Sequence, residues 1–179
     1  MLKTLVPATL VAVFALACSS SSFADGPSSA APSAGDFRYQ KALTEATKVV
    51  VRDMNGPIRV EPASGDLLEI VAIKTGPKED VVRVQVVTRE EAGTIVVCAV
   101  WPGQDASTCR PGASPSGSSD NDVRVKVEFR LRVPSKMVVI DAHTVNGDIA
   151  AQSPAGEVHL HTINGTIDPT IRSTTSACS

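Results

Sequence analysis

Three histidines, His143, His159 and His161, have a spacing that could support metal chemistry in this chain of 179 residues. His159 and His161 are two positions apart, so on a β-strand both side chains project from the same face. His143 and His161 occupy equivalent places in an 18-residue repeat, and stacked strands would bring them about 4.8 Å apart. The group could bind zinc or copper at the surface, or it could be a polar ladder on an exposed strand.

A second pair with chemical potential is Cys98 and Cys109, which lie 11 positions apart. In an oxidising compartment such a pair is expected to form a disulfide that closes a short loop, worth about 2–3 kcal/mol in the chain-entropy model. A redox-active pair is the alternative, although the CxxC spacing is absent. The sequence also lacks a Gly-x-Ser-x-Gly elbow and a phosphate-binding glycine loop, so we expect neither an enzyme nor a cofactor.

The elements that would position these residues are β-strands, because Val and Ile fill most apolar positions. We expect strands at residues 47–52, 67–74, 81–88, 94–100, 123–133, 137–142 and 157–161. Segment 123–133 has the clearest pattern, since apolar and charged residues alternate over its eleven positions. This alternation predicts one buried and one exposed face.

Two further features are candidate contact sites. The exposed face of segment 123–133 could bind anionic glycans or lipid headgroups, or it could be an ordinary solvated face; its cations are Arg124, Lys126, Arg130 and Arg132. Trp101 precedes a proline in a loop near Cys98, where it could contact a glycan or a protein. Alternatively, Trp101 covers the end of the core.

The strongest internal signal is a repeat. Residues 144–149 (TVNGDI) recur 18 positions later as residues 162–167 (TINGTI). Related units contain Gly56, Gly65 and Gly156, so that successive glycines lie nine residues apart within each group. Each of the five units has a polar residue four positions before its glycine: Arg52, Glu61, His143, Gln152 and His161. The pattern predicts strands of about five residues, stacked as coils or paired as a flat ladder. Because Asn-Gly supplies the positive φ of a tight turn, turns are expected at Asn55-Gly56, Asn146-Gly147 and Asn164-Gly165.

Composition argues against several functional classes. A net charge of −2 does not fit a polybasic nucleic-acid binder, and an aromatic content of 3% leaves few platforms for base stacking. With 42% hydrophobic residues, the whole chain is not expected to be disordered. No nucleic-acid partner is therefore expected.

The N-terminus is typical of an export signal. Lys3 precedes an apolar stretch of about 14 residues, too short to span a bilayer comfortably, and residues 22–24 (SFA) offer a cleavage site. We expect a signal peptide at 1–24, a flexible linker at 25–44, a β-repeat domain at 45–170 and a tail at 171–179. Alternatively, residues 15–18 (ALAC) form a lipobox, and Cys18 would carry a lipid anchor.

These motifs resemble the bacterial β-strand-repeat proteins of the DUF4097 type, a family of proposed adhesins. The likeness covers roughly residues 46–168 and rests on the Asn-Gly repeats, on segment 95–102 with Cys109, and on residues 132–134. It implies an exported β-solenoid or β-roll without established catalytic residues. Members usually continue through more repeats, whereas this chain stops repeating after Asp168, as a truncated or frame-shifted member would. The last coil would then lack a stacking partner, and we expect it to need a cap from the tail or from another chain, which favours self-association.

We therefore expect an all-β fold, a short β-solenoid or β-roll with a 9- and 18-residue period. An immunoglobulin-like sandwich is the competing architecture. The expected function is non-enzymatic, adhesin-like binding in the cell envelope, with a surface protein or glycan as partner and membrane contact only through a lipid anchor. The alternatives are a periplasmic accessory protein of envelope-stress signalling and a small metal-binding protein that uses the histidines.

Overall fold

The computed structural model describes residues 36–43, 47–113, 122–134, 138–152 and 157–170. Within these ranges it is mostly β, which confirms the predicted all-β class. The strands are β1 (Phe37–Ala42), β2 (Thr47–Arg52), β3 (Ile58–Pro62), β4 (Leu67–Thr75), β5 (Gln85–Glu91), β6 (Thr94–Val100), β7 (Lys126–Val133), β8 (Val138–Asn146), β9 (Ile149–Gln152), β10 (Val158–Asn164) and β11 (Ile167–Thr170). Helix α1 (Lys78–Val81) and the 3₁₀ turn η1 (Ala106–Thr108) complete the described elements.

The predicted signal peptide, the candidate lipidation site Cys18 and the tail at 171–179 lie outside the described residues. In the ranges that the structure describes, no helix has the length and apolar character needed to cross a membrane.

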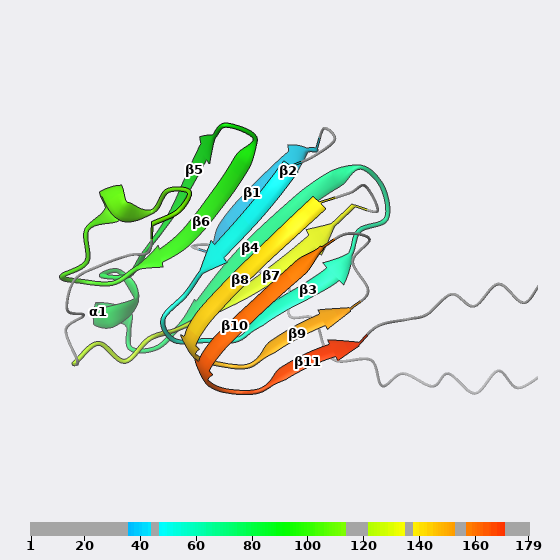
Figure 1. Cartoon of the computed structure of the whole chain (residues 1–179). Helices are drawn as coiled ribbons and strands as arrows, with labels where there is room; N and C mark the ends of the chain where they lie inside the picture. The colour runs from blue at the N-terminus through cyan, green and yellow to red at the C-terminus, as the bar shows by residue number, and fades with distance from the viewer. Residues whose placement is uncertain (1–35, 44–46, 114–121, 135–137, 153–156, 171–179) are drawn as a thin grey trace, which may run out of the picture. The chain divides into compact units, whose positions relative to one another are not determined.

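Two mixed sheets enclose the main core (Figure 1). The six-stranded sheet has the order β1-β4-β7-β3-β9-β11, and the five-stranded sheet has the order β10-β8-β2-β6-β5. The neighbours among β6, β2, β8 and β10, and among β7, β3, β9 and β11, are parallel. Strands β1, β4 and β5 add antiparallel pairs at one end of each sheet.

The parallel part consists of two-strand coils in which the chain passes from the five-stranded sheet to the six-stranded one. Three coils, β2–β3, β8–β9 and β10–β11, turn at the predicted Asn-Gly sites. Their register places Asn146 beside Asn164 on one side and in a bridge with Asn55 on the other. The β2–β3 coil therefore stands between β8–β9 and the coil made by β6 and β7, although it comes first in the chain.

Glycine is needed in this column of turns because neighbouring turns approach too closely for a side chain. A Cβ added at Gly147 would collide with the carbonyl oxygen of Gly56, and one at Gly165 with that of Gly147. The Gly56 and Gly147 amides donate to the Asn146 and Asn164 carbonyl oxygens, both at 3.0 Å. Positive φ was the expected reason for these glycines, but only Gly56 of the three has it, so that reason is wrong for Gly147 and Gly165.

The core follows the sequence pattern closely where coils stack on both sides. Alternate residues of β7 are buried as predicted, and Ile58 and Ile149, two positions after the repeat glycines, are fully buried. Ile167 in the last coil is 42% exposed, and Leu67, two positions after Gly65, is 46% exposed. Leu67 departs from the pattern because the chain reverses there into antiparallel β4 instead of returning to the other sheet.

Two sequence expectations need correction. Residues 37–42 were assigned to the linker, but they form β1, since Phe37 and Tyr39 pack on the core and Leu43 is buried beside it. The strand expected at 81–88 is replaced by α1 followed by β5. The buried Asp80 of that helix accepts a hydrogen bond from the Arg124 amide at 3.0 Å, which fixes the helical turn against the segment before β7.

Candidate functional site

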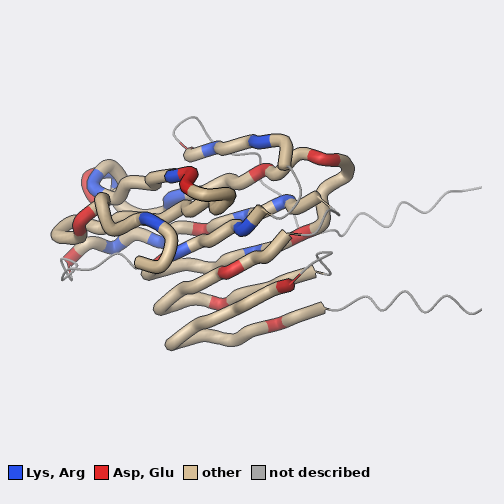
Figure 2. The backbone as a smooth tube through the Cα atoms, turned by 45° about the horizontal axis from the view of Figure 1, so that its top comes forward, with Lys and Arg blue, Asp and Glu red and all other residues tan. Residues whose placement is uncertain are grey.

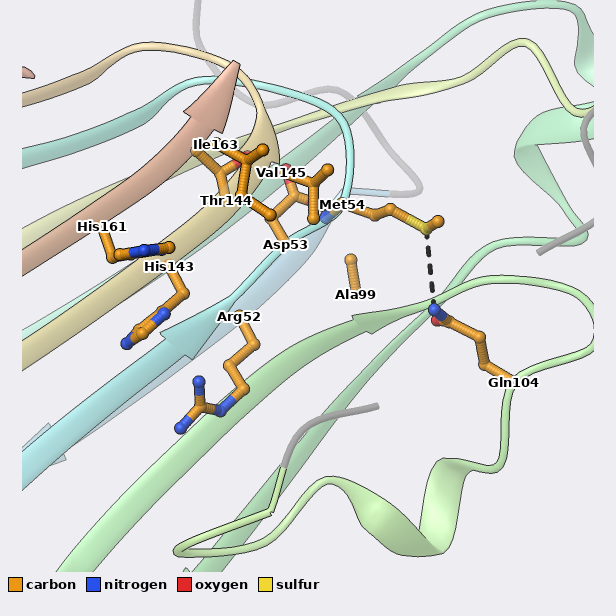
Figure 3. Close-up of a pocket in the computed structure, with 10 residues that line it drawn as sticks. All are labelled: Arg52, Asp53, Met54, Ala99, Gln104, His143, Thr144, Val145, His161 and Ile163. Carbon is orange, nitrogen blue, oxygen red and sulfur yellow. Dashed lines mark hydrogen bonds between the residues drawn. The ribbon is translucent and has the colours of Figure 1, made fainter. Parts of the chain in front are cut away.

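A hollow of about 330 Å³ lies on the outer face of the five-stranded sheet, the face turned away from the main core. Its lining comes from three coils, from the end of β6 and from the loop after it: Arg52, Asp53, Met54, Ala99, Gln104, His143, Thr144, Val145, His161 and Ile163 (Figure 3). The volume is at the lower end of the range for small-molecule sites. We call this feature the histidine–arginine hollow.

A row of polar side chains crosses the hollow. The parallel register pairs His161 with His143, and His143 with Arg52. The two imidazole rings lie 5.1 Å apart between centroids and are tilted by 33°. These three residues are those that precede each Asn-Gly glycine by four positions, so the repeat itself creates the row.

An apolar wall runs beside this row. It consists of Met54, Val145 and Ile163, which hold the same place in the three coils, and Ile163 is 64% exposed. The Gln104 side chain reaches the wall from the loop, its Nε2 donating to the Met54 sulfur at 3.6 Å (Figure 3). Its Oε1 accepts from the Trp101 amide at 2.9 Å, which fixes the loop at that side of the hollow.

Charges around His143 are arranged in a short chain. Asp141 Oδ1 lies 2.7 Å from His143 Nε2, and Asp141 Oδ2 lies 3.2 Å from Lys48 Nζ. Burial would raise the pKa of Asp141, but the Lys48 hydrogen bond and the nearby positive charges outweigh it and hold the pKa below its ordinary value. Burial lowers the pKa of His143, and Arg52 and His161 add to this against the opposing effect of Asp141.

Arg52 is the cation of the row. Its Nε is buried and has no hydrogen-bond partner among the described residues. A guanidinium carries five donors, and leaving a buried donor unpaired costs free energy. Arg52 therefore has hydrogen-bonding capacity that the described part of the chain does not use.

Asp53 is a buried carboxyl group at the edge of the hollow that sequence reasoning missed. Its amide donates to the His143 carbonyl oxygen at 2.8 Å, and its Oδ1 accepts from the Met54 amide at 2.8 Å. Oδ2 is buried without a partner within the described ranges. Burial raises the pKa of Asp53 to about 7, although hydrogen bonds from the Met54 and Asn55 amides oppose the shift. In the sequence, Asp53 is distinguished only by preceding its repeat glycine by three positions, as Thr144 and Thr162 do.

The three histidines do not gather into one cluster. His159 lies opposite Asp141, one row away from the hollow, with its Nε2 3.1 Å from Glu157 Oε1. Across the described residues, no group of three or more His, Cys, Asp or Glu side chains is placed to hold a metal ion. A metal site at His143 and His161 would need further ligands from elsewhere.

The predicted disulfide is confirmed. Cys98 and Cys109 are bonded, with their Cα atoms 5.9 Å apart. The bond holds the loop over the outer face of β6, where Cys98 and Cys109 join Val50, Val96 and Val100 in a small second core. The loop thereby covers one part of the outer face and leaves the hollow beside it.

The two predicted contact features are less available for binding. Trp101 is only 4% exposed and belongs to the main core, in agreement with the alternative that it covers the core. On β7, Arg130 Nε lies 2.8 Å from Glu128, and Arg132 Nη1 lies 3.6 Å from Glu69. The Arg124 and Lys126 side chains are exposed, so this part of the predicted cationic face stays open to solvent.

The sequence matches no model of a known protein family, and no curated protein is significantly similar to it. Solved structures similar to this chain include a proposed cell adhesion protein from Clostridium sporogenes, which is 14% identical over 79% of this chain and 64% of that one, with a TM-score of 0.46. They also include proposed adhesins from Bacteroides fragilis (16% identity, 77% of this chain and 54% of that one, TM-score 0.37) and Parabacteroides merdae (8% identity, 71% of this chain and 43% of that one, TM-score 0.32). This chain spans less than two thirds of the length of each of them.

Proposed function

We propose that this protein is a non-enzymatic, adhesin-like binding module that acts outside the cytoplasm. The observation that carries the proposal is the histidine–arginine hollow, in which a row of polar groups and an apolar wall meet on an outer sheet face. Ligand sites characteristically combine a largely apolar lining with a few fixed polar groups. Hydrogen-bonded strands beneath the hollow hold these side chains in place, which lowers the cost of ordering them upon binding.

The architecture supports a repeat scaffold for such a surface. We take the coils β6–β7, β2–β3, β8–β9 and β10–β11 as a short β-solenoid of the DUF4097 type. The aligned Asn-Gly turns and the parallel register support this interpretation. In a stack of this kind each coil contacts only its neighbours, so outward side chains can differ between proteins while the inner ones keep the core.

The disulfide supports a location outside the cytoplasm. Bonded cysteines persist in oxidising compartments and are rare in the cytosol, where thiols are kept reduced. A signal peptide at 1–24, or a lipid anchor at Cys18, would deliver the domain there. The two routes differ in the mass of the mature N-terminus, which mass spectrometry of the exported protein measures.

Protease treatment of intact cells, with permeabilised cells as the control, tests the location. Cleavage on intact cells supports display at the surface and therefore adhesion. Protection on intact cells, followed by cleavage after permeabilisation, contradicts adhesion. It would favour the accessory role in the periplasm.

Binding of the exported protein to surface preparations tests the hollow itself. The variant Ile163→Asp places a charge on the exposed apolar wall, and we expect it to reduce binding without unfolding the protein, because Ile163 is mostly solvent-exposed. The matched control is Leu67→Asp, an exposed apolar residue on the other sheet. Equal loss in both variants would contradict a role for the hollow.

A further inference from the structure

We propose that the histidine–arginine hollow binds an acidic sugar residue, with the sugar carboxylate on Arg52 and the sugar ring against His143 and His161. This inference rests on the proposed binding function and adds the chemical class of the ligand. Charge, ring surface and size each contribute to it.

The charge of the hollow favours an anion. Lys48 and His143 are already engaged with Asp141, whereas no ion pair of Arg52 is found in the described ranges. The segments 138–152 and 157–170 contain no Lys or Arg, as the lower coils in Figure 2 show. Arg52 therefore brings a positive charge, from an earlier part of the chain, to the two histidines. A guanidinium recognises a carboxylate through two parallel hydrogen bonds.

The negative charge of the carboxyl groups near the hollow is reduced or offset, which limits its repulsion of a bound anion. Asp53 is buried, and since burial raises its pKa to about 7, much of it is uncharged near neutral pH. Asp141 faces Lys48 on its other oxygen, and Lys48 and Arg52 both act on its charge, although Arg52 makes no ion pair with it. The remaining groups that face the hollow, Gln104 and Thr144, are neutral.

The ring surface favours a sugar over a simple anion. A pyranose has C–H groups on its faces and hydroxyl groups around its rim. The tilted imidazole pair and the wall of Met54, Val145 and Ile163 offer an apolar surface for such a face. Asp141 takes Nε2 of His143, which leaves Nδ1 of that ring and the ring nitrogens of His161 for hydrogen bonds with sugar hydroxyl groups. A volume of about 330 Å³ suits a small ligand and is too small for a folded partner.

Titration of the exported protein with glucuronate, glucose and inorganic sulfate, followed by NMR, tests the proposal. We expect glucuronate to bind most tightly and to shift the His143 and His161 ring signals. Arg52→Gln should weaken glucuronate binding about tenfold or more, the equivalent of one charged hydrogen-bonded contact. The matched control Arg132→Gln removes a guanidinium from the outer face of the other sheet and should leave the affinity unchanged.

A second variant protects the test against misfolding. His161 is exposed, so His161→Ala should fold and yet weaken glucuronate binding by removing half of the imidazole pair. Equal binding of glucose would show that the charge has no role, and equal binding of sulfate would show that the ring has none; either result overturns the proposal. A loss shared by Arg132→Gln also overturns it.

Failure of this inference can be separated from failure of the proposed function. If glucuronate does not bind but the protein still attaches to surface preparations in a manner sensitive to Ile163→Asp, only the sugar assignment is wrong. If attachment is also absent, the binding function itself is wrong.

Discussion

The outer faces of the two sheets carry similar residue types and use them differently. On the six-stranded sheet, Glu128 lies within 3.2 Å of both Arg59 and Arg130, and Glu69 pairs with Arg38 and Arg132. On the five-stranded sheet, Arg52 stands beside two histidines, with its Nε unpaired among the described residues. On the first face each of these four arginines has a carboxylate oxygen within 3.6 Å, whereas on the second no ion pair of Arg52 is found among the described residues.

The difference shows that a run of basic residues is a poor guide to a binding surface. The alternating Arg and Lys residues of β7 are conspicuous in the sequence, yet Arg130 and Arg132 pair with carboxylates on β7 itself and on β4. Arg52 is inconspicuous because its neighbours in space, His143 and His161, lie far along the chain. The partners of a charge decide its use more than the number of like charges near it.

The largest expected effect comes from breaking the column of turns on which both faces depend. Gly147→Val would drive its side chain into the carbonyl group of Gly56 and separate the β8–β9 coil from β2–β3. We expect a loss of about 3–5 kcal/mol in the free energy of unfolding, because the backbone cannot yield without breaking hydrogen bonds. Urea denaturation measures it.

Gly93→Asn is the matched control for that substitution. Gly93 has a φ of 74° and open space around its Cβ position, and asparagine tolerates this conformation. We expect less than about 1 kcal/mol of destabilisation. A similar loss in both variants would mean that the close approach of the turns is unimportant.

The next largest effect concerns how the stability of the fold depends on pH near the hollow. Asp53, at the edge of the hollow, has its pKa raised from 3.8 to about 7, so the folded state holds the proton more tightly than the unfolded state. Its ionisation therefore destabilises the fold progressively as pH rises from about 4 to 7. Asp53→Asn should match the wild type near pH 4 and exceed it by up to about 4 kcal/mol above pH 7.

Glu128 on the opposite face should show the reverse sign. Burial would raise the pKa of Glu128, but its hydrogen bonds and ion pairs with Arg130 and Arg59 lower it. Its contribution is present above the unfolded pKa and is lost as the pH falls through the folded pKa. Glu128→Gln should thus lower stability at neutral pH and lose this effect in acid. Denaturation curves across pH for both variants provide the measurement; parallel profiles would contradict the distinction.

A smaller effect is expected from the loop beside the hollow. Replacing Cys98 and Cys109 together by alanine opens the disulfide loop and should cost about 2–3 kcal/mol. Because Gln104 in that loop contacts Met54, the wall of the hollow should also become more mobile. Thermal unfolding measures the first consequence, and Met54 methyl NMR signals report the second. Unchanged signals would show that the wall does not depend on the loop.

The smallest effect should come from an ion pair on the outer face of the six-stranded sheet. Arg132→Gln removes an exposed ion pair with Glu69, and such pairs contribute about 0–1 kcal/mol. Salt titration of the unfolding free energy checks this. A loss well above that range would mean that the ion pairs of this face stabilise the fold, and the contrast between the faces would need revision.

Much of the fold was predictable, and so was part of the site. The 18-residue offset correctly placed His161 beside His143, because parallel coils preserve register. Strand β6 was predicted at its observed bounds, since a run of valines and isoleucine is flanked by turn residues. Strand β1 was missed because its half-exposed residues show little hydrophobic pattern, and only its packing on β4 makes it a strand.

Arg52 could not be joined to the histidines from sequence. A period tells which residues are equivalent but not which coil stacks on which, and Arg52 and His143 are 91 positions apart. The burial of the Asp53 carboxyl was likewise not predictable, because Asp53 follows the end of β2, which lies between the distant strands β6 and β8. These relations come from long-range pairing and have no local signature.

The placement of the β2–β3 coil between later segments has a consequence for folding kinetics. Val51 pairs with Val97 on one side and with Ala142 on the other. Both contacts close long loops. Because the chain loses the entropy of these loops before the strand pairing can stabilise the fold, such topologies fold slowly. The coil that leaves the ribosome first can complete its hydrogen bonding only after β8 has been made. Folding of this domain therefore cannot follow the order of synthesis.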